Sequence, residues 1–333
     1  MSVLVTGGTG FVAGWTIRQL LDRGYTVRTT VRDLAKESRL RVTFPGVGLR
    51  LEVVAADLGS DAGWAEAVAD TEAVLHVASP MGGGTAPNDP DELIRPARDG
   101  ALRVLRAAVD ARVPRVVMTS SGAAATPPNG AEGVFDEALW TNPDQPGLDA
   151  YRRSKAIAER AAWDFMAEHG GDTTFSTVLP GGVFGPLLPG QGLGSVEVIG
   201  RMLHGMPGVP HIGINVVDVR DVADLHIRAM ESANAAGQRF IAVGGFLWMR
   251  EMSALLRAEL GEAGRKAPTR ELPDWGVKLM ARLQPGLAQL VPMLGRRYTY
   301  TTANARDLLG WDPRPAEVTV VDCGRSLVER GLG

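Results

Sequence analysis

The chain has 333 residues, of which 45% are hydrophobic and 22% charged, and its formal net charge at pH 7 is -3. These values are ordinary for globular proteins and exclude a disordered or fibrous chain. The weakly acidic balance contains no block of like charges, so we expect no nucleic acid partner.

In the first two thirds of the chain, short β-branched runs alternate with longer helical patterns, which is typical of βαβ units and a parallel sheet. The pattern predicts strands at 3–6, 26–31, 51–55, 73–77, 115–118 and 174–179, with candidates near Val216 and at 239–243. It predicts helices at 15–23, 64–69, 93–111 and 151–169.

Two segments rich in Gly and Pro, 122–147 and 181–210, interrupt this rhythm, and loops of such length are usually functional. After Phe246 we expect helices only, at 249–260, 275–283 and 303–309. The fold class predicted is therefore α/β: a Rossmann doubly wound parallel sheet with a smaller, mostly helical C-terminal substrate lobe. The expected core comprises 1–180 plus about 212–245, and the expected lobe about 181–211 plus 246–333.

A glycine-rich loop stands between the first predicted strand and the first helix. Glycine lets a backbone approach a pyrophosphate, and the following helix N-terminus offers free N–H groups. The glycine motif can be aligned in two ways, as Gly7, Gly10 and Ala13 or as Gly8, Gly10 and Ala13. Both alignments predict dinucleotide binding. A plain strand-to-helix turn is the alternative. The residues expected to contact the cofactor here are Thr6, Gly7, Thr9, Gly10, Phe11 and Val12.

The end of the second strand indicates which nicotinamide cofactor is bound. An acid there accepts the ribose 2′-OH of NAD, whereas an Arg accommodates the 2′-phosphate of NADP. Val31 stands where the acid would be, and Arg32 follows with Lys36 nearby, which favours NADP(H). The adjacent Asp33 weakens this preference, and a merely solvated Arg32 is the alternative. Further cofactor contacts are expected after the third and fourth strands, at Asp57, Leu58, Val77, Ala78 and Ser79.

A catalytic pair is predicted at the start of a helix. Tyr151 and Lys155 are four residues apart and share one helix face, where the Lys ammonium can stabilise a phenolate. The C-terminal end of the fifth strand leads through Thr119 and Ser120 to Ser121, at the sheet edge where parallel sheets bind ligands, and we assign Ser121 the hydrogen bond to the substrate. Thr119 and Ser120 compete for that role, and Ser121 could simply turn the chain.

Together, these segments resemble an extended short-chain dehydrogenase/reductase. The resemblance is carried by 6–13, Arg32, 119–121 and 151–155, and within the superfamily it is strongest to dihydroflavonol reductase-like and cinnamoyl-CoA-reductase-like carbonyl reductases. The segments that favour this subgroup are 27–33, 76–81, 136–140 and 180–186.

The resemblance implies further site residues. It places Pro180 and Val183 beside the nicotinamide, with the Val183 backbone bonding the carboxamide, and Thr119 and Ser120 against the cofactor. Asp99 stands where relatives commonly have Asn, which puts an Asn-dependent proton relay in doubt.

The function predicted is NADPH-dependent reduction of a ketone or aldehyde, with Tyr151 as proton donor and no metal. Met81, Phe184 and Leu187 are expected to border an apolar pocket, so we expect a hydrophobic or aromatic substrate. A nucleotide-sugar epimerase or dehydratase is one alternative, although Gly122 and three alanines follow Ser121 where dehydratases carry an Asp-Glu pair. A non-catalytic NADP-sensing protein is the other.

The chain carries one cysteine, Cys323, which can form no intramolecular disulfide and favours a reducing cytoplasm. No apolar run approaches the ~20 residues that span a bilayer, and no basic segment precedes the first strand, so we expect neither membrane insertion nor export. The expected partner is a small carbonyl compound, and a homodimer stays open.

Overall fold

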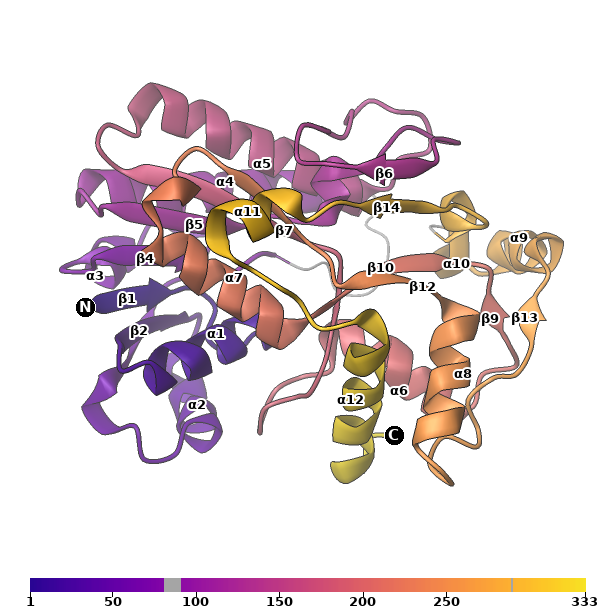
Figure 1. Ribbon diagram of the computed structural model, residues 1–333. Helices are drawn as coiled ribbons and strands as arrows, with labels where there is room; N and C mark the ends of the chain where they lie inside the picture. Colours follow the sequence, from indigo (N-terminus) through magenta and orange to yellow (C-terminus); the bar gives the residue numbers. More distant parts are fainter. Residues whose placement is uncertain (81–90, 289) are drawn as a thin grey trace.

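The computed structural model describes residues 1–80, 91–288 and 290–333, and its centre is a seven-stranded sheet (Figure 1). The strand order is β11-β7-β5-β4-β1-β2-β3, and every neighbouring pair is parallel. The strands are β1 (Ser2–Val5), β2 (Thr26–Val31), β3 (Leu51–Ala55), β4 (Ala73–His76), β5 (Arg115–Thr119), β7 (Thr174–Pro180) and β11 (Arg239–Ala242).

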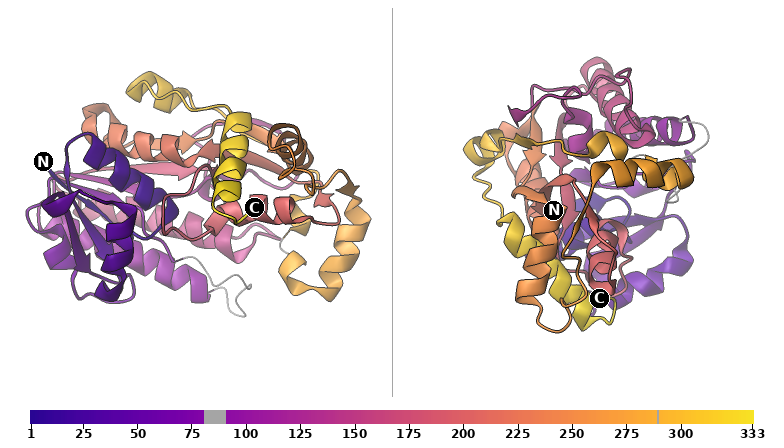
Figure 2. Two further views of the ribbon diagram at one scale, coloured as in Figure 1. Left: turned by 90° about the horizontal axis from the view of Figure 1, so that it is seen from below. Right: turned by 90° about the vertical axis from the view of Figure 1, so that its right-hand side faces the viewer.

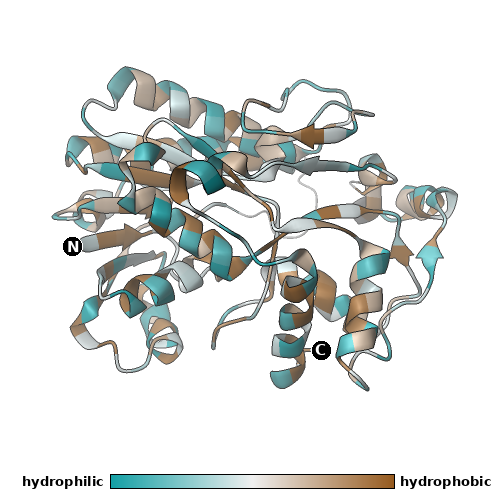
Figure 3. Cartoon of the chain, viewed as in Figure 1, coloured by the Kyte–Doolittle hydropathy of each residue, from teal (hydrophilic) through white to brown (hydrophobic). Residues whose placement is uncertain are grey.

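Helices cover both faces of this sheet, because its strands are apolar on both sides. Val3 and Val5 pack toward one helical layer and Leu4 toward the other, as the twofold alternation of a strand requires. The first layer holds α1 (Phe11–Asp22), α2 (Glu37–Thr43), α7 (Val219–Glu231) and α11 (Ala303–Leu309). The second holds α3 (Trp64–Val68), α4 (Asp91–Asp110) and α5 (Ala150–His169). Figure 3 shows the strands mostly in hydrophobic colours and the outer helices mixed.

The order of the strands locates a binding crevice. From β1 the chain builds outward through β2 and β3, and then returns to the other side of β1 to form β4. Ligands of open α/β sheets bind where the order reverses in this way, outside the carboxyl ends of the strands. The loops after β1 and β4 therefore border the expected cofactor site.

The second half of the molecule holds small sheets and most of the remaining helices (Figure 2). A three-stranded sheet has the order β12-β10-β8, and two-stranded pairs join β13 to β9 and β14 to β6. The strands are β6 (Gly133–Phe135), β8 (Gly182–Phe184), β9 (Val209–Pro210), β10 (Gly213–Asp218), β12 (Gly245–Trp248), β13 (Glu271–Leu272) and β14 (Tyr298–Tyr300). The helices are α6 (Glu197–His204), α8 (Met249–Glu259), α9 (Asp274–Leu283), α10 (Pro285–Ala288) and α12 (Ala316–Glu329).

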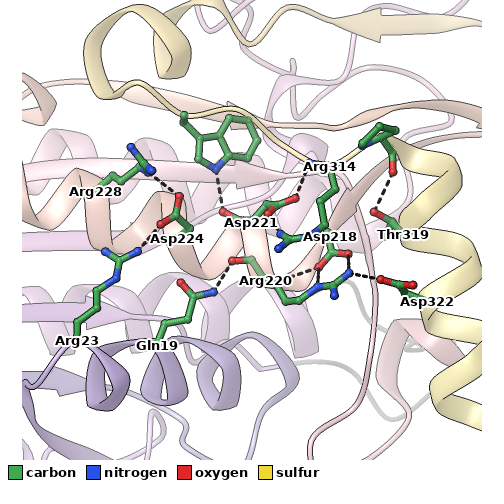
Figure 4. Close-up of polar contacts among 12 residues, drawn as sticks. Gln19, Arg23, Asp218, Arg220, Asp221, Asp224, Arg228, Arg314, Thr319 and Asp322 are labelled. Carbon is green, nitrogen blue, oxygen red and sulfur yellow. Dashed lines mark hydrogen bonds and ion pairs between the residues drawn. The ribbon is translucent and has the colours of Figure 1, made fainter. Parts of the chain in front are cut away.

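Polar contacts of α7 join the two halves (Figure 4). Gln19 of α1 donates to the carbonyl of Arg220 over 2.7 Å. The Arg220 guanidinium pairs with Asp218, which is fully buried, and with Asp322 of α12, each at 2.7 Å. These carboxylates raise the pKa of Arg220, so the guanidinium keeps its charge, and the ion pair with Asp322 ties α12 to the start of α7.

The α/β fold with a doubly wound parallel sheet is confirmed, but two expectations about the second half are wrong. Strands do not stop after Phe246, since β12 pairs antiparallel with β10 and β13 and β14 follow. The segment near Val216, expected in the core sheet, forms β10 of the separate sheet. Both errors have one cause: these short strands pair with segments far away in the sequence, and local patterns do not show such partners.

None of the helices in the described ranges combines the length and hydrophobicity that crossing a bilayer requires.

Candidate active site

Steric contacts explain the glycines after β1. Gly7 has φ +76°, and a Cβ there would lie 2.9 Å from the Cβ of Ala78, in the loop after β4. A Cβ on Gly8 would lie 2.4 Å from Oγ1 of Thr29, and one on Gly10 3.1 Å from the carbonyl oxygen of Gly7. Both registers of the motif therefore describe required glycines, Gly7 for its backbone angle and Gly8 for its contact with β2.

The start of α1 is suited to a pyrophosphate. Gly10 is the N-cap residue of α1, and among the described residues no side chain caps it. Thr9 and Gly10 are exposed, while Phe11 and Val12 are half-buried. Free N–H groups at the positive end of a helix dipole form an anion site, and glycines at 7, 8 and 10 let a ligand approach them closely, so the residues present fit a dinucleotide.

The end of β2 carries an available positive charge. Val31 is buried, Arg32 and Lys36 are exposed, and neither cation forms a hydrogen bond or ion pair within the described ranges. Asp33 is engaged locally, because its carboxylate accepts the N–H of Ala35 over 2.9 Å and caps a short 3-10 turn. Because the Asp33 carboxylate is engaged in this cap, it counts less against the binding of a phosphate at Arg32.

Thr6 supports the loop after β4 from inside the protein. It is fully buried, its hydroxyl accepts the N–H of Ala78 over 2.9 Å, and it lies 2.9 Å from Nδ1 of His76. The hydroxyl and Nδ1 of His76 share one hydrogen, and the tautomer of His76 determines which of the two donates it. The Thr6 side chain is therefore engaged inside the protein, and a contact of this residue with the cofactor stays a prediction. The other residues expected beside the cofactor after β3 and β4 are half-buried: Asp57, Leu58, Val77, Ala78 and Ser79.

Tyr151 and Lys155 occupy the first turns of α5, which begins with Asp149 accepting the N–H of Arg152 over 2.8 Å. Tyr151 is 39% exposed, whereas Lys155 is only 8% exposed. The Lys155 ammonium lies 5.6 Å from the centre of the Tyr151 ring and donates to Oγ of Ser79 over 2.6 Å. The accessible Tyr151 phenol therefore lies next to the buried Lys155 ammonium, and this ammonium also contacts the loop after β4.

The three hydroxyl residues that end β5 point in different directions. Thr119 lies 2.7 Å from Nε2 of His226, and Ser120 donates to Glu159 over 2.7 Å, so both side chains are bonded inside the protein. Ser121 is half-buried and caps the 3-10 turn Gly122–Ala125 by accepting the N–H of Ala123 over 3.1 Å. Its own hydroxyl proton remains available to donate.

Packing gathers these segments at one place. The turn after Ser121 packs against α5, and a Cβ on Gly122 would lie 3.3 Å from the carbonyl oxygen of Pro180 at the end of β7. Val183 follows on β8, half-buried, with its carbonyl accepting the hydroxyl of Ser195. A cavity at the carboxyl ends of β4 and β5 includes Ser79, Thr119, Ser120 and Lys155 in its lining.

Comparisons with known proteins agree with this geometry. The sequence pattern of the NAD dependent epimerase/dehydratase family matches residues 3–244. The chain belongs to this family. Cinnamoyl-CoA reductase 1 of Petunia hybrida is 38% identical over 247 residues, which cover 72% of each chain. Ketoreductase azaE of Aspergillus niger is 32% identical and covers 98% of each chain.

Among solved structures, yeast methylglyoxal/isovaleraldehyde reductase Gre2 in complex with NADPH superposes over the whole of both chains, with a TM-score of 0.83 and 26% identity. The protein is thus an extended short-chain dehydrogenase/reductase, in the group of NAD(P)-dependent reductases that includes cinnamoyl-CoA reductases, dihydroflavonol reductases and ketoreductases.

The expected substrate pocket of this reductase needs correction. Phe184 and Leu187 are 3% and 4% exposed and pack in the apolar core of the second half. Both belong to the hydrophobic cluster that also contains Val216 of β10 and Val320 of α12, so they are core residues in this structure and not pocket lining. Met81 lies outside the described residues. Asp99 is partly exposed on α4 and pairs with the neighbouring Arg98 at 2.7 Å.

Two supporting residues of the reductase were not predicted. Tyr300 of β14 donates its hydroxyl to the carbonyl of Ala125 over 2.9 Å, with the carbonyl of Gly122 at 3.2 Å. Thr141 donates to the carbonyl of Ala123 over 2.8 Å. Both hold the turn that carries Ser121. Tyr300 lies far from that turn in the sequence, and only pairing of β14 with β6 brings it there.

Two histidines lie beneath the site. Burial, with the nearby Lys155 charge, lowers the pKa of His76 to about 3. Burial lowers the pKa of His226 to about 4, and its Nδ1–H donates to the carbonyl of Val222 over 2.7 Å. Both rings are therefore neutral in the folded protein at pH 7.

We expect acid to destabilise the reductase through these rings. An unfolded His binds a proton near pH 6.5, and the buried rings resist protonation down to pH values of about 3 and about 4. As the pH falls below 6.5 the unfolded state gains protons first, so each ring should cost about 2 kcal/mol of unfolding free energy between pH 7.5 and 5.

Urea unfolding at these two pH values checks this expectation. His226→Asn should show a smaller difference between pH 7.5 and 5 than the wild type, whereas His169→Asn, at an exposed position, should not. An unchanged difference in the His226 variant would contradict the buried neutral ring.

Proposed function

We propose that this reductase converts a ketone or aldehyde into the alcohol with NADPH, using Tyr151 as proton donor. The observation that carries the proposal is the exposed Tyr151 phenol above the buried Lys155 ammonium, beside the Ser121 turn. When bound, the nicotinamide cofactor supplies the hydride. The remaining work, which is binding, orientation and proton transfer, belongs to residues of this chain.

Each residue of the site has a defined task. Ser121 donates a hydrogen bond to the carbonyl oxygen, which polarises the carbonyl and orients it. Tyr151 gives its proton to the same oxygen as negative charge develops there. Lys155 stabilises the resulting phenolate through its positive charge, and its bond to Ser79 fixes the ammonium in place. Pro180 and Val183 are proposed to flank the nicotinamide.

The preference for NADPH rests on Arg32. Its guanidinium is exposed at the end of β2, without a partner in the described ranges, and Val31 occupies the position where an acid would accept the 2′-OH of NAD. Lys36 adds a second exposed cation in the turn that follows. A ribose 2′-phosphate supplies the anion that such a pair binds.

The substrate is proposed to be a hydrophobic aldehyde or ketone. Support comes from two relatives: one is named for cinnamoyl-CoA, a thioester of an aromatic acid, and the other for methylglyoxal and isovaleraldehyde, which are both aldehydes. The side chains of Phe184 and Leu187 no longer support this preference, because they are part of the core.

The epimerase or dehydratase alternative fits less well. Dehydratases place an Asp-Glu pair just after the catalytic hydroxyl residue, but here Gly122 and Ala123 follow Ser121.

NADPH consumption, measured by its absorbance with a panel of aromatic and aliphatic ketones and aldehydes, tests the proposed function. We expect NADPH to be consumed with at least one ketone or aldehyde, in the absence of any sugar nucleotide. Binding of NADPH without turnover on any carbonyl would overturn the proposal and favour a sensing role, and conversion of a sugar nucleotide would favour the epimerase.

Replacing Arg32 by Ser tests the cofactor preference. Charge-assisted bonds to phosphate contribute ~1.5–3 kcal/mol, so kcat/KM for NADPH should fall by about 10- to 100-fold. The value for NADH should not fall, because NADH lacks the 2′-phosphate. Equal losses with both cofactors would show that Arg32 has another role, and Lys36→Ser measures the share of the second cation.

A further inference from the structure

The buried carboxylate of Glu159 has no part in the proposed chemistry. Glu159 is 1% exposed and follows Tyr151 by eight residues on α5, so Tyr151, Lys155 and Glu159 share one face of the helix. Four side chains donate to its carboxylate: Ser120 Oγ at 2.7 Å, Thr177 Oγ1 at 2.8 Å, Arg239 Nε at 2.9 Å and Nη2 at 3.2 Å, and Trp163 Nε1 at 3.4 Å.

One of these donors is the residue directly before Ser121. The bond from Ser120 therefore joins the end of β5 to α5, the helix that carries Tyr151. It is charge-assisted and buried, and such bonds are short and strong. The two residues proposed to bind the carbonyl oxygen thus stand on segments that Glu159 links directly.

Arg239 of β11 extends the link to the segment 136–140, which the function does not otherwise explain. Its Nη1 donates to the carbonyl of Leu139 over 2.8 Å and to that of Glu137, and its guanidinium lies 3.7 Å from the centre of the Trp140 ring. The Arg160 guanidinium stacks on the same ring at 4.0 Å.

Beyond Trp140 the chain returns to the Ser121 turn. The N–H of Thr141 donates to the carbonyl of Ala124 over 2.9 Å, and its hydroxyl donates to that of Ala123 over 2.8 Å. Glu159 therefore holds Ser121 from both sides, through Ser120 before it and through Arg239 and Thr141 after it.

We propose that Glu159 is a positioning residue, which sets the location of the Ser121 hydroxyl relative to the Tyr151 phenol. This role rests on the proposed carbonyl reduction. A hydroxyl that must donate to a developing oxyanion tolerates little displacement, since a shift of about 1 Å can cost about 100-fold in rate. A buried ion pair by itself adds little net stability to the folded state. Its benefit here is the accurate placement of the Ser121 hydroxyl.

Two matched variants test the proposal, because each removes one hydroxyl bonded to Glu159. Ser120→Ala removes the hydroxyl beside Ser121, and Thr177→Val removes one on β7 that does not adjoin the site residues. We expect Ser120→Ala to lower kcat by about 10- to 100-fold. Thr177→Val should keep kcat and lower only Tm.

A second measurement does not depend on turnover. Hydrogen exchange of the backbone at 121–126 should speed up in Ser120→Ala and stay slow in Thr177→Val, with Glu159→Gln close to the first variant. If the wild type reduces no carbonyl, the proposed function fails, and the exchange data still decide whether Glu159 orders this turn. Equal effects of the two hydroxyl variants on kcat and exchange would overturn the positioning role.

Discussion

Replacing Tyr151 by Phe should lower kcat by about 10²- to 10⁴-fold, because a positioned general acid contributes a factor of that size. Phe keeps the ring that lies 5.6 Å from the Lys155 ammonium and removes only the phenolic proton. NADPH binding, measured by fluorescence titration, should therefore be retained. The decisive comparison is the rate at saturating NADPH and carbonyl substrate, in wild type and variant.

Tyr25→Phe is the matched control for this variant. The Tyr25 hydroxyl donates to Glu231 over 2.7 Å, on the helical layer formed by α1 and α7, so its loss removes a phenol without touching the site. Turnover should be unchanged. Substantial residual activity in Tyr151→Phe would show that another group, or water, protonates the product.

Removal of the Ser121 hydroxyl should have the second largest effect. A lost donor to a developing oxyanion typically costs about 10²–10³ in kcat, and we expect Ser121→Ala to fall in this range. The same hydroxyl accepts the N–H of Ala123, so the variant should also lose about 1 kcal/mol of unfolding free energy.

Ser232→Ala separates these two effects. The Ser232 hydroxyl accepts the N–H of Asn234 over 3.2 Å at the start of a 3-10 turn, which is the arrangement of Ser121 at a place far along the chain. The Ser232→Ala variant should lose a similar amount of unfolding free energy and keep full turnover. If Ser121→Ala lost only what Ser232→Ala loses, the hydroxyl would serve the turn and not the reaction.

The first two thirds of the fold could be predicted from sequence because the signals there are local. The expected strands at 26–31 and 51–55 coincide with β2 and β3, and the helix that carries Tyr151 begins one residue before the expected start. Buried parallel strands read as continuous apolar runs, and glycine is demanded wherever a backbone must turn or approach closely. Tyr151 and Lys155 lie together because helical spacing alone brings them to one face.

What the sequence left open depends on contacts between distant segments. Among Thr119, Ser120 and Ser121, only the bonds to His226 and Glu159 show which hydroxyl remains free. Phe184 and Leu187 read as pocket residues, because an apolar side chain after a glycine-rich turn can face a ligand or a core with equal ease.

Glu159 depends on both local sequence signals and contacts between distant segments. Its position eight residues after Tyr151 can be read from the sequence, but its partners come from β5, β7 and β11. The sequence by itself determined the cofactor loop, the parallel sheet and the helical pair of Tyr and Lys, since each follows from short-range backbone geometry. The tertiary structure alone decided which of the three hydroxyl side chains stays free of partners inside the protein, because Thr119 and Ser120 find their partners 107 and 39 residues away, and only packing of the sheet and helices brings these segments together.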